Sequence, residues 1–258
     1  MILDLGKKEP DAVFFITPSP LCMAYLVDIF KDCLTNWVIQ SELAPSLFCD
    51  KGVTKAVVKD QLNARRRLAM RTGILGYVET SPSFIRIFSP YVAEVFPKYR
   101  VVHVLQDPLK CAVNLRSLMG KSPYPQSSSD DEIAGPKKVA DHYKDWSPFQ
   151  WYLHHVYECH ARGFRLRDKL LLQDRYYALS LESVKSVGER RRLSRWLDSG
   201  AVSQQGVPFC GTVGDEVPHI GHIREYGDWY KGLDKDSQSR VDHVNQQFGV
   251  SDGYQTRV

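Results

Sequence analysis

Polar side chains follow three apolar runs of the sequence, and their types suit anion binding and proton removal. Thr17 and Ser19 come directly after the first run, Glu79 after the second and Gln106 after the third, with Asn114 further along. Hydroxyl and amide groups donate hydrogen bonds to phosphate-like oxygens, and a carboxylate can act as a general base. If the runs are neighbouring strands, these residues form an anion site beside a base.

The elements that must position these side chains follow from the apolar pattern. A short continuous apolar run, typical of a buried parallel strand, occupies residues 12–16, and further strands are predicted over residues 74–78, 100–105 and 176–181. Apolar residues at helical spacing predict helices over about 23–38, 54–70, 82–95, 108–118, 149–164, 182–197 and 234–248, the last closed by Gly249. The alternation predicts an α/β fold with three layers, in which helices cover both faces of a mostly parallel sheet. Ligands then bind beyond the carboxyl ends of the strands.

The order of the strand ends resembles the sulfotransferase family, whose members move a sulfuryl group from 3′-phosphoadenosine 5′-phosphosulfate (PAPS) to an alcohol or amine. Residues 15–26 stand where the family has a strand, a phosphosulfate-binding loop and a helix, and residues 79–82 are similar to the segment that carries its proposed base. Residues 101–108, followed by Asn114, resemble its second cofactor element. Further similar segments are residues 151–158, 161–162, 179–182 and 212–214.

The resemblance implies one domain over residues 1–258, with a P-loop-like fold, PAPS as donor and no metal. Its acceptor would be the hydroxyl or amine of a small molecule or carbohydrate. The implied site residues are Glu79 as general base, Thr17 and Ser19 for the 5′ end of the nucleotide, and Gln106, Asn114 and Arg224 for its 3′-phosphate.

The first loop departs from the family pattern, which motivates a second hypothesis. Residues 17–24 contain no Gly, Lys or Arg, and Pro18 and Pro20 each remove a backbone donor. Gln106 stands in place of the family's arginine. At about 1.5–3 kcal/mol per charged hydrogen bond, losing both cations could turn micromolar binding into millimolar, unless Lys110, Arg116 or Arg224 compensates. The alternative is a catalytically impaired sulfotransferase-like protein that acts as a binding or assembly module.

Glu79 and two groups of basic residues also have simpler interpretations. Glu79 could favour the N-terminus of the helix that begins near Pro82, and this interpretation weighs about equally with the catalytic one. The arginines at 65–67 and 71 are assigned to the favourable end of a helix dipole, and the run at 190–192 to a solvated helix face. Core or surface positions account for the 149–164 helix residues His154, His155, Glu158, Cys159 and His160, and for the loop pair His219 and His222.

Composition limits the partners and the location. The net charge of +4 is too small to indicate nucleic acid or a membrane surface as a partner, and no apolar run reaches the length of a membrane span. The scattered cysteines are interpreted as buried apolar side chains. Residues 120–138, rich in Pro, Gly and Ser, predict a loop or mobile lid, and the stretch from Gly200 to Gly227 is also predicted to be rich in loops. These features favour a cytoplasmic protein, or a lumenal Golgi one if an anchor precedes this sequence in a longer chain; the oligomeric state is left open.

Overall fold

Five strands form one parallel sheet in the computed structural model, which describes residues 11–19, 25–27, 36–40, 54–71, 74–80, 84–119, 145–170, 174–181, 183–199 and 218–250. The strands are β1 (Asp11–Ile16), β2 (Trp37–Gln40), β3 (Gly76–Glu79), β4 (Arg100–Leu105) and β5 (Tyr176–Ser180). Their order is β2-β3-β1-β4-β5, and every neighbouring pair is parallel. The predicted α/β fold is confirmed. The order reverses at β1, where ligand sites of such sheets are expected.

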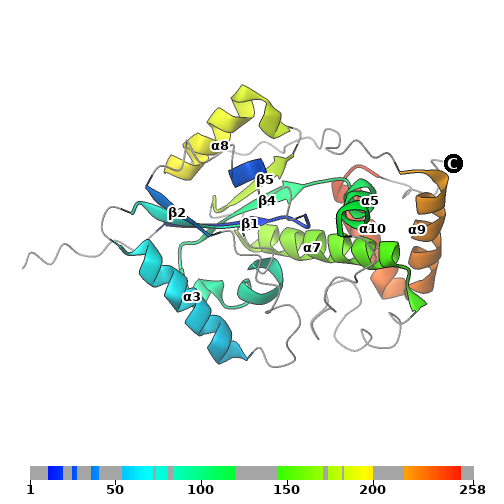
Figure 1. Ribbon diagram of the computed structural model, residues 1–258, viewed down its shortest axis with the longest axis horizontal. Helices are drawn as coiled ribbons and strands as arrows, with labels where there is room; N and C mark the ends of the chain where they lie inside the picture. The colour runs from blue at the N-terminus through cyan, green and yellow to red at the C-terminus, as the bar shows by residue number, and fades with distance from the viewer. Residues whose placement is uncertain are drawn as a thin grey trace, which may run out of the picture.

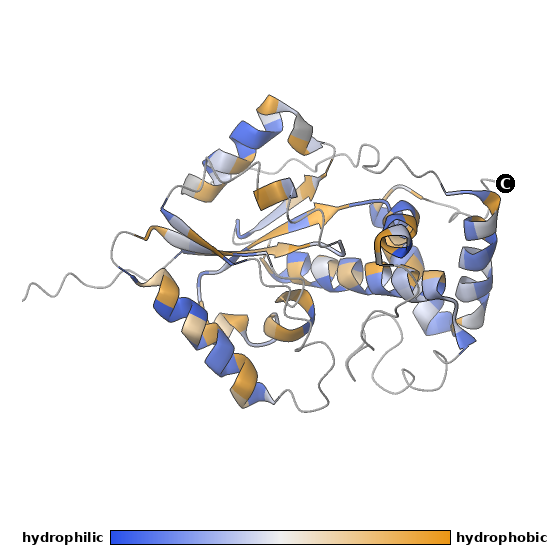
Figure 2. Ribbon diagram, viewed as in Figure 1, coloured by the Kyte–Doolittle hydropathy of each residue, from blue (hydrophilic) through white to orange (hydrophobic). Residues whose placement is uncertain are grey.

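Helices cover both faces of the sheet (Figure 1). One face carries α3 (Lys55–Ala69), the π-helical turn η1 (Phe84–Phe88), α4 (Val92–Val95) and the C-terminal half of α7 (Pro148–Leu170), whose apolar side chains share a core with Phe14 and Tyr77. The other face carries α8 (Val187–Ser199), whose buried Trp196 packs with Phe15 and Val102. Figure 2 shows apolar residues along much of β1 and β4, while the surrounding helices carry both apolar and polar residues.

A bundle of helices lies beyond the carboxyl ends of the strands (Figure 1). It consists of α5 (Pro108–Met119), α9 (Ile220–Gly232), α10 (Lys235–Gln247) and the N-terminal half of α7. The bundle shares one apolar core that begins at Leu105, the last residue of β4. This core fixes the helices that start at the strand ends, where the predicted site lies.

Local signals explain the boundaries of several predicted helices. Thr54 accepts a hydrogen bond from Val57 N at the start of α3, and Asp234 accepts one from Ser237 N at the start of α10. Gly249, just past α10, has φ 68°, a conformation that glycine adopts without strain. These ends confirm the predictions from sequence.

The end of the helix predicted over residues 23–38 is wrong, because Trp37 and Val38 belong to strand β2. Trp37 pairs with Gly76 of β3, and its ring lies where a β-carbon on Gly76 would come within 2.6 Å. The aromatic ring thus covers the glycine of the next strand. Cross-strand packing of this kind overrides a helical spacing of apolar residues.

Two other helix predictions need correction. The single helix over residues 82–95 is divided into η1 and α4, because Pro90 lies between them and lacks the N–H that a continuous helix needs. The stretch up to Gly227, predicted as loop, contains the first half of α9, which buries Tyr226 and Trp229. Residues 81–83 and the predicted loop at 120–138 lie outside the described residues.

Candidate functional site

The ends of β1 and β4 are joined by side chains that the sequence singles out. Gln106 donates its side-chain N–H to Thr17 Oγ1 over 3.4 Å, and the Ser19 amide donates to the same oxygen over 3.2 Å. The Thr17 hydroxyl donates in turn to the Ser19 carbonyl over 3.3 Å. All three residues are buried. The structure therefore brings together three of the predicted site residues.

The Thr17 hydroxyl uses its whole hydrogen-bonding capacity within this segment. A hydroxyl has one donor hydrogen and two acceptor lone pairs, and here the hydrogen goes to Ser19 while both lone pairs receive N–H groups. The Ser19 hydroxyl, by contrast, has no hydrogen-bond partner among the described residues. Thr17 therefore shapes the turn, and Ser19 has the hydroxyl that is available to a ligand.

Helix α5 begins directly at the end of β4. Asp107 caps it, because its Oδ1 accepts from the backbone N–H of Lys110 over 3.0 Å. Asn114 lies two turns further along α5 and is partly buried. Arg116 is exposed and pairs with Glu225 of α9 over 3.5 Å. One of the cations considered as compensation is thus paired with a carboxylate.

Arg224 lies on α9, rather than in a loop as the sequence indicated, and it is exposed. It neighbours Glu225, the residue that pairs with α5. Residues 212–214, which resemble the C-terminal cofactor segment, lie outside the described residues. The structure places Arg224 on the bundle and not on the strand ends that hold Thr17 and Gln106.

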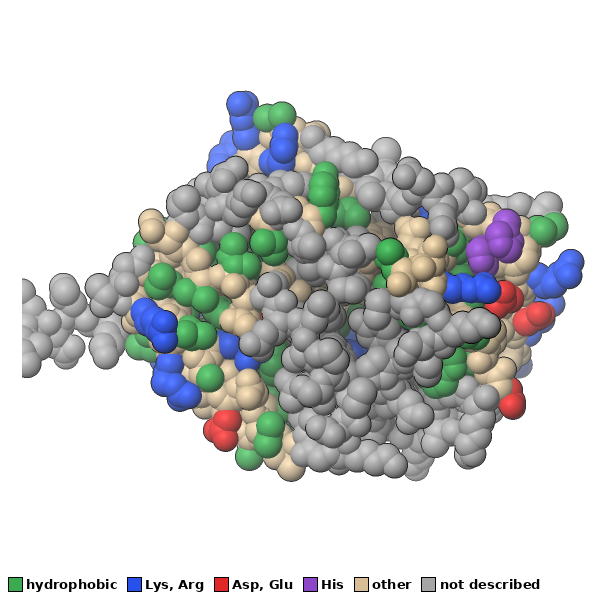
Figure 3. Space-filling view, in the orientation of Figure 1, with side chains coloured by type: hydrophobic (Ala, Val, Ile, Leu, Met, Phe, Trp, Pro, Cys, Tyr) green, Lys and Arg blue, Asp and Glu red, His purple; other side chains and the backbone are tan. Residues whose placement is uncertain are grey.

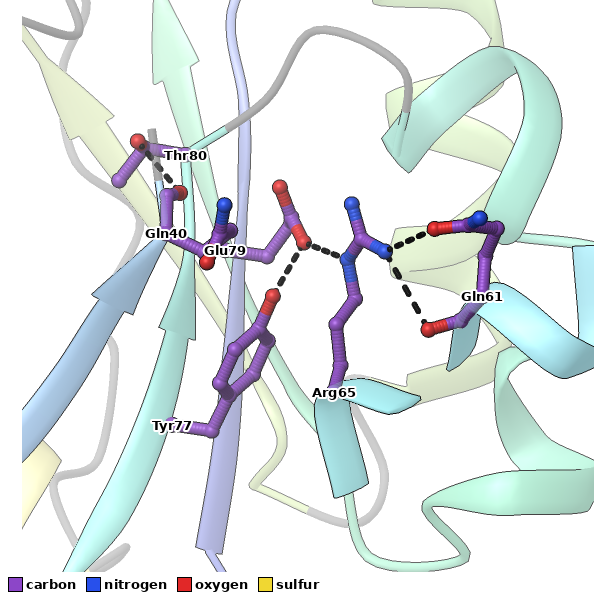
Figure 4. A network of polar contacts seen from close by, with 6 residues as sticks. All are labelled: Gln40, Gln61, Arg65, Tyr77, Glu79 and Thr80. Atoms are coloured by element: carbon purple, nitrogen blue, oxygen red, sulfur yellow. Dashed lines mark hydrogen bonds and ion pairs between the residues drawn. The ribbon is translucent and has the colours of Figure 1, made fainter. Parts of the chain in front are cut away.

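Glu79 lies within a buried polar network at the end of β3 (Figure 4). Its carboxylate accepts the Nε–H of Arg65 over 2.6 Å and the hydroxyl hydrogen of Tyr77 at short range, and its side chain exposes no surface. Arg65 also donates to the side-chain oxygen of Gln61 over 3.1 Å and to its backbone carbonyl over 3.2 Å. A buried carboxylate is stable when paired and hydrogen-bonded in this way.

Arg65 therefore corrects one interpretation of the sequence. It was grouped with the arginines at the end of α3, yet it is only 5% exposed and is directed at the sheet, while Arg66 and Arg67 occupy the last helical turn. Burial, and next the charge of Glu79, raise the pKa of Tyr77, so this hydroxyl stays a donor. Tyr77 and Glu79 are two apart on one strand and share a face, a signal that was available in the sequence.

Buried histidines contact β4 and the segment that follows β1. His155 of α7 contacts the carbonyl oxygen of Pro18 through Nε2 over 3.1 Å. His160, one turn further along α7, contacts His103 of β4 over 2.9 Å, and His103 contacts the Tyr176 hydroxyl over 2.6 Å. The sequence assigned His155 and His160 to ordinary core or surface positions, and it did not single out His103.

Burial keeps these histidines neutral. It is the main cause that lowers the pKa of His103 and of His155 far below 6.5, and it lowers that of His160 to about 3. The next cause for His155 is the nearby positive charge of Arg86, on η1. The sequence did not single out Arg86, and only the packing of η1 against α7 brings it near His155.

Other groups that the sequence raised have structural contacts. Glu158 pairs with Arg162 one turn along α7, and burial raises the pKa of the Cys159 thiol to about 11. His219 caps α9 by accepting from Gly221 N, and its ring stacks on His222 at 3.7 Å. The arginine run at 190–192 lies on α8, where Lys and Arg side chains gather at the surface (Figure 3).

The described residues contain neither a metal-binding cluster nor a membrane-spanning helix. Within these ranges no cluster of three or more His, Cys, Asp or Glu side chains could hold a metal ion. Within the same ranges, no helix combines the length and the apolarity that crossing a bilayer requires.

Comparisons with known proteins identify the fold. No protein-family model matches the chain, and no curated protein matches it significantly. Among solved structures, it is similar to a sulfotransferase from Alicyclobacillus acidocaldarius, with 14% sequence identity and a TM-score of 0.54 over 90% of this chain and 95% of that one. At this identity the likeness concerns the fold. The chain has a sulfotransferase-like α/β fold, with an all-parallel sheet flanked by helices.

Proposed function

We propose that the chain is a PAPS-dependent sulfotransferase whose nucleotide site lies at the ends of β1 and β4. The hydrogen bond between Gln106 and Thr17 is the observation that carries this proposal, because it joins the two predicted cofactor segments at the point where the strand order reverses. The fold likeness supports it. PAPS would supply the sulfuryl group and leave as adenosine 3′,5′-bisphosphate.

The residues at these strand ends offer neutral hydrogen-bond donors to a nucleotide that carries two separate anionic groups. The Ser19 hydroxyl would donate to the 5′-phosphosulfate, held in place by the Thr17 turn. The side-chain amides of Gln106 and Asn114 would donate to the 3′-phosphate, with Arg224 as a contributor from α9. Arg86, close enough to lower the pKa of His155, adds positive charge near the loop.

Glu79 would take the proton of the acceptor. In the reaction, the acceptor oxygen forms a bond to sulfur, the bond from sulfur to the 5′-phosphate oxygen breaks, and the acceptor proton passes to the carboxylate. Arg65 favours the ionised form that a base needs. Because Glu79 exposes no surface, its carboxylate must turn from Arg65 and Tyr77 towards the acceptor before it can act.

The same burial supports a second candidate function. A carboxylate fixed by Arg65 and Tyr77 already has the contacts of a structural residue. In this alternative, the protein keeps the fold and serves as a binding or assembly module without transfer activity, and the Glu79 network only stabilises the end of β3.

Transfer from radiolabelled PAPS to a panel of phenols, alcohols, amines and sugars tests both candidates. Glu189 provides a matched control, because it is also buried and also accepts from a tyrosine (Tyr177, 2.6 Å) and an arginine (Arg192, 2.9 Å), but on α8. We expect Glu79→Gln to lower the transfer rate at least 100-fold, about the smaller contribution of a general base, and Glu189→Gln to keep it. Equal rates in the two variants would remove Glu79 as the base, and nucleotide binding without any transfer would favour the binding module.

A further inference from the structure

His155 makes a directed contact with the loop that follows β1. Its side chain is 2% exposed and its Nε2 lies 3.1 Å from the carbonyl oxygen of Pro18. A carbonyl oxygen can only accept a hydrogen bond, so Nε2 must carry the hydrogen. The contact therefore fixes both the tautomer of His155 and the direction of the Pro18 carbonyl.

Pro18 is the point at which this segment most needs a partner. Proline has no N–H, so its carbonyl is its whole contribution to backbone hydrogen bonding. On either side of it, Thr17 and Ser19 bond to each other. The segment 17–19 is thus held from β4 through Gln106 and from α7 through His155.

The same helix also supports the end of β4. His160 contacts His103 of β4. An interaction with the backbone of Gln106 partly offsets the lowering of the His160 pKa by burial. Gly163 lets the helix approach, because a β-carbon there would lie 2.3 Å from the His103 ring. Helix α7 therefore contacts both β4 and the segment that follows β1.

We propose that His155 is a positioning residue of the nucleotide site: through Pro18, it holds the turn that presents the Ser19 hydroxyl to the anion. This inference rests on the proposed function for its ligand, but the contact itself can be tested without one. The histidine acts as a neutral donor in a buried place where leucine would fill the space and donate nothing.

The charged and titratable groups around His155 favour its neutral form, in which the ring has one hydrogen to donate. Arg86 faces it from η1, and His154 and His160 act on it from α7 itself; all three lower its pKa, after burial as the largest cause. The hydrogen bond to the Pro18 carbonyl raises the pKa of His155. Since an isolated charge there would be costly, the ring keeps one hydrogen, on Nε2.

The experiment compares His155→Leu, which removes the donor, with His155→Gln, whose side-chain amide can take the place of Nε2–H. His222→Leu is the control, since this histidine is also buried but lies on α9 against Phe149. Two quantities are measured at pH 8: amide hydrogen exchange of segment 17–19, and the affinity for adenosine 3′,5′-bisphosphate by calorimetry. Thermal unfolding verifies that each variant is folded.

We expect His155→Leu to speed exchange of the Ser19 amide and to weaken nucleotide binding at least tenfold, while His155→Gln and His222→Leu stay within about threefold of the unaltered protein, a difference under 1 kcal/mol. Unchanged exchange and affinity in His155→Leu would overturn the inference. If the unaltered protein bound no nucleotide, the proposed function would fail, and exchange in segment 17–19 would still decide whether His155 fixes the turn.

Discussion

Arg65 of α3 and Glu79 of β3 form a buried ion pair, with Nε 2.6 Å from the carboxylate oxygen and side chains 6% and 0% exposed. The pair links a helix that covers the sheet to the end of a strand beside the proposed site. The strength of this pair determines whether the Glu79 carboxylate is available for chemistry.

Removing one partner of this pair should be costly. Arg65→Met leaves a buried carboxylate without its cation, and we expect a loss of about 3–5 kcal/mol in the free energy of unfolding. The double variant Arg65→Met/Glu79→Gln should recover much of this loss, because no uncompensated charge remains. Urea denaturation of the single and double variants measures both effects; a loss below about 1 kcal/mol for Arg65→Met would show that water reaches the carboxylate.

The protein should lose stability as the pH falls from 7 to 5. The folded-state pKa values of His103, His155 and His160 lie below 6.5, so the unfolded chain binds more protons in this range and acid favours it. Each histidine contributes up to about 1.4 kcal/mol per pH unit once the pH is below 6.5, and the three together about 4.

Urea midpoints at pH 8, 7, 6 and 5 measure this slope. His160→Phe, which leaves one titrating group fewer, should reduce the slope by about a third if the three histidines contribute equally. A stability that stays level between pH 7 and pH 5 would mean that the three rings take up protons in the folded protein as readily as in the unfolded chain.

Two glycine-to-alanine changes should have opposite effects. Alanine in a helix is more favourable than glycine by about 1 kcal/mol, and Gly227 of α9 has nothing within 4 Å of a β-carbon, so Gly227→Ala should stabilise the protein. At Gly163 the β-carbon would meet the His103 ring at 2.3 Å, so Gly163→Ala should destabilise it. Thermal unfolding of the two variants measures the difference, and a stabilising Gly163→Ala would contradict the close approach of α7 to β4.

Much of the sheet was predictable because its signals are local. The run at 12–16 is continuous and apolar, the segment at 100–105 is rich in valine and ends at a turn, and both are strands. Trp37 and Val38 fit a helical spacing as well as a strand, and only the pairing of Trp37 with Gly76 decides between them. No helix was predicted over residues 220–232, where burial of Tyr226 and Trp229 stabilises α9.

The site was predictable only in part, because its partners come from distant segments. The sequence singled out Thr17, Ser19 and Gln106, and the structure joins them. Nothing local distinguishes Arg65 from the arginines beside it, and its contact with Glu79 depends on how α3 packs on the sheet. The His155 contact with Pro18 spans 137 positions of the chain and could not be inferred from spacing.

Substitutions at Thr17 and Ser19 should distinguish an effect on stability from an effect on nucleotide affinity. Thr17→Val leaves the Ser19 and Gln106 N–H groups without their acceptor, so the free energy of unfolding should fall by about 1–3 kcal/mol. Ser19→Ala removes only the available hydroxyl, so stability should stay within about 0.5 kcal/mol and nucleotide affinity should fall by about two- to tenfold. Urea denaturation and calorimetric titration measure these quantities; an unchanged affinity in Ser19→Ala would exclude its hydroxyl from the site.

Thermal unfolding with adenosine 3′,5′-bisphosphate tests most directly whether the ends of β1 and β4 hold a nucleotide. The ligand at ten times its dissociation constant adds about 1.4 kcal/mol of stability. We expect millimolar ligand to raise the melting temperature, adenosine 5′-monophosphate to raise it less, and Gln106→Arg, which adds a charged donor, to increase the shift through about tenfold tighter binding or more. No rise with the unaltered protein, and none with Gln106→Arg, would contradict a nucleotide site at these strand ends.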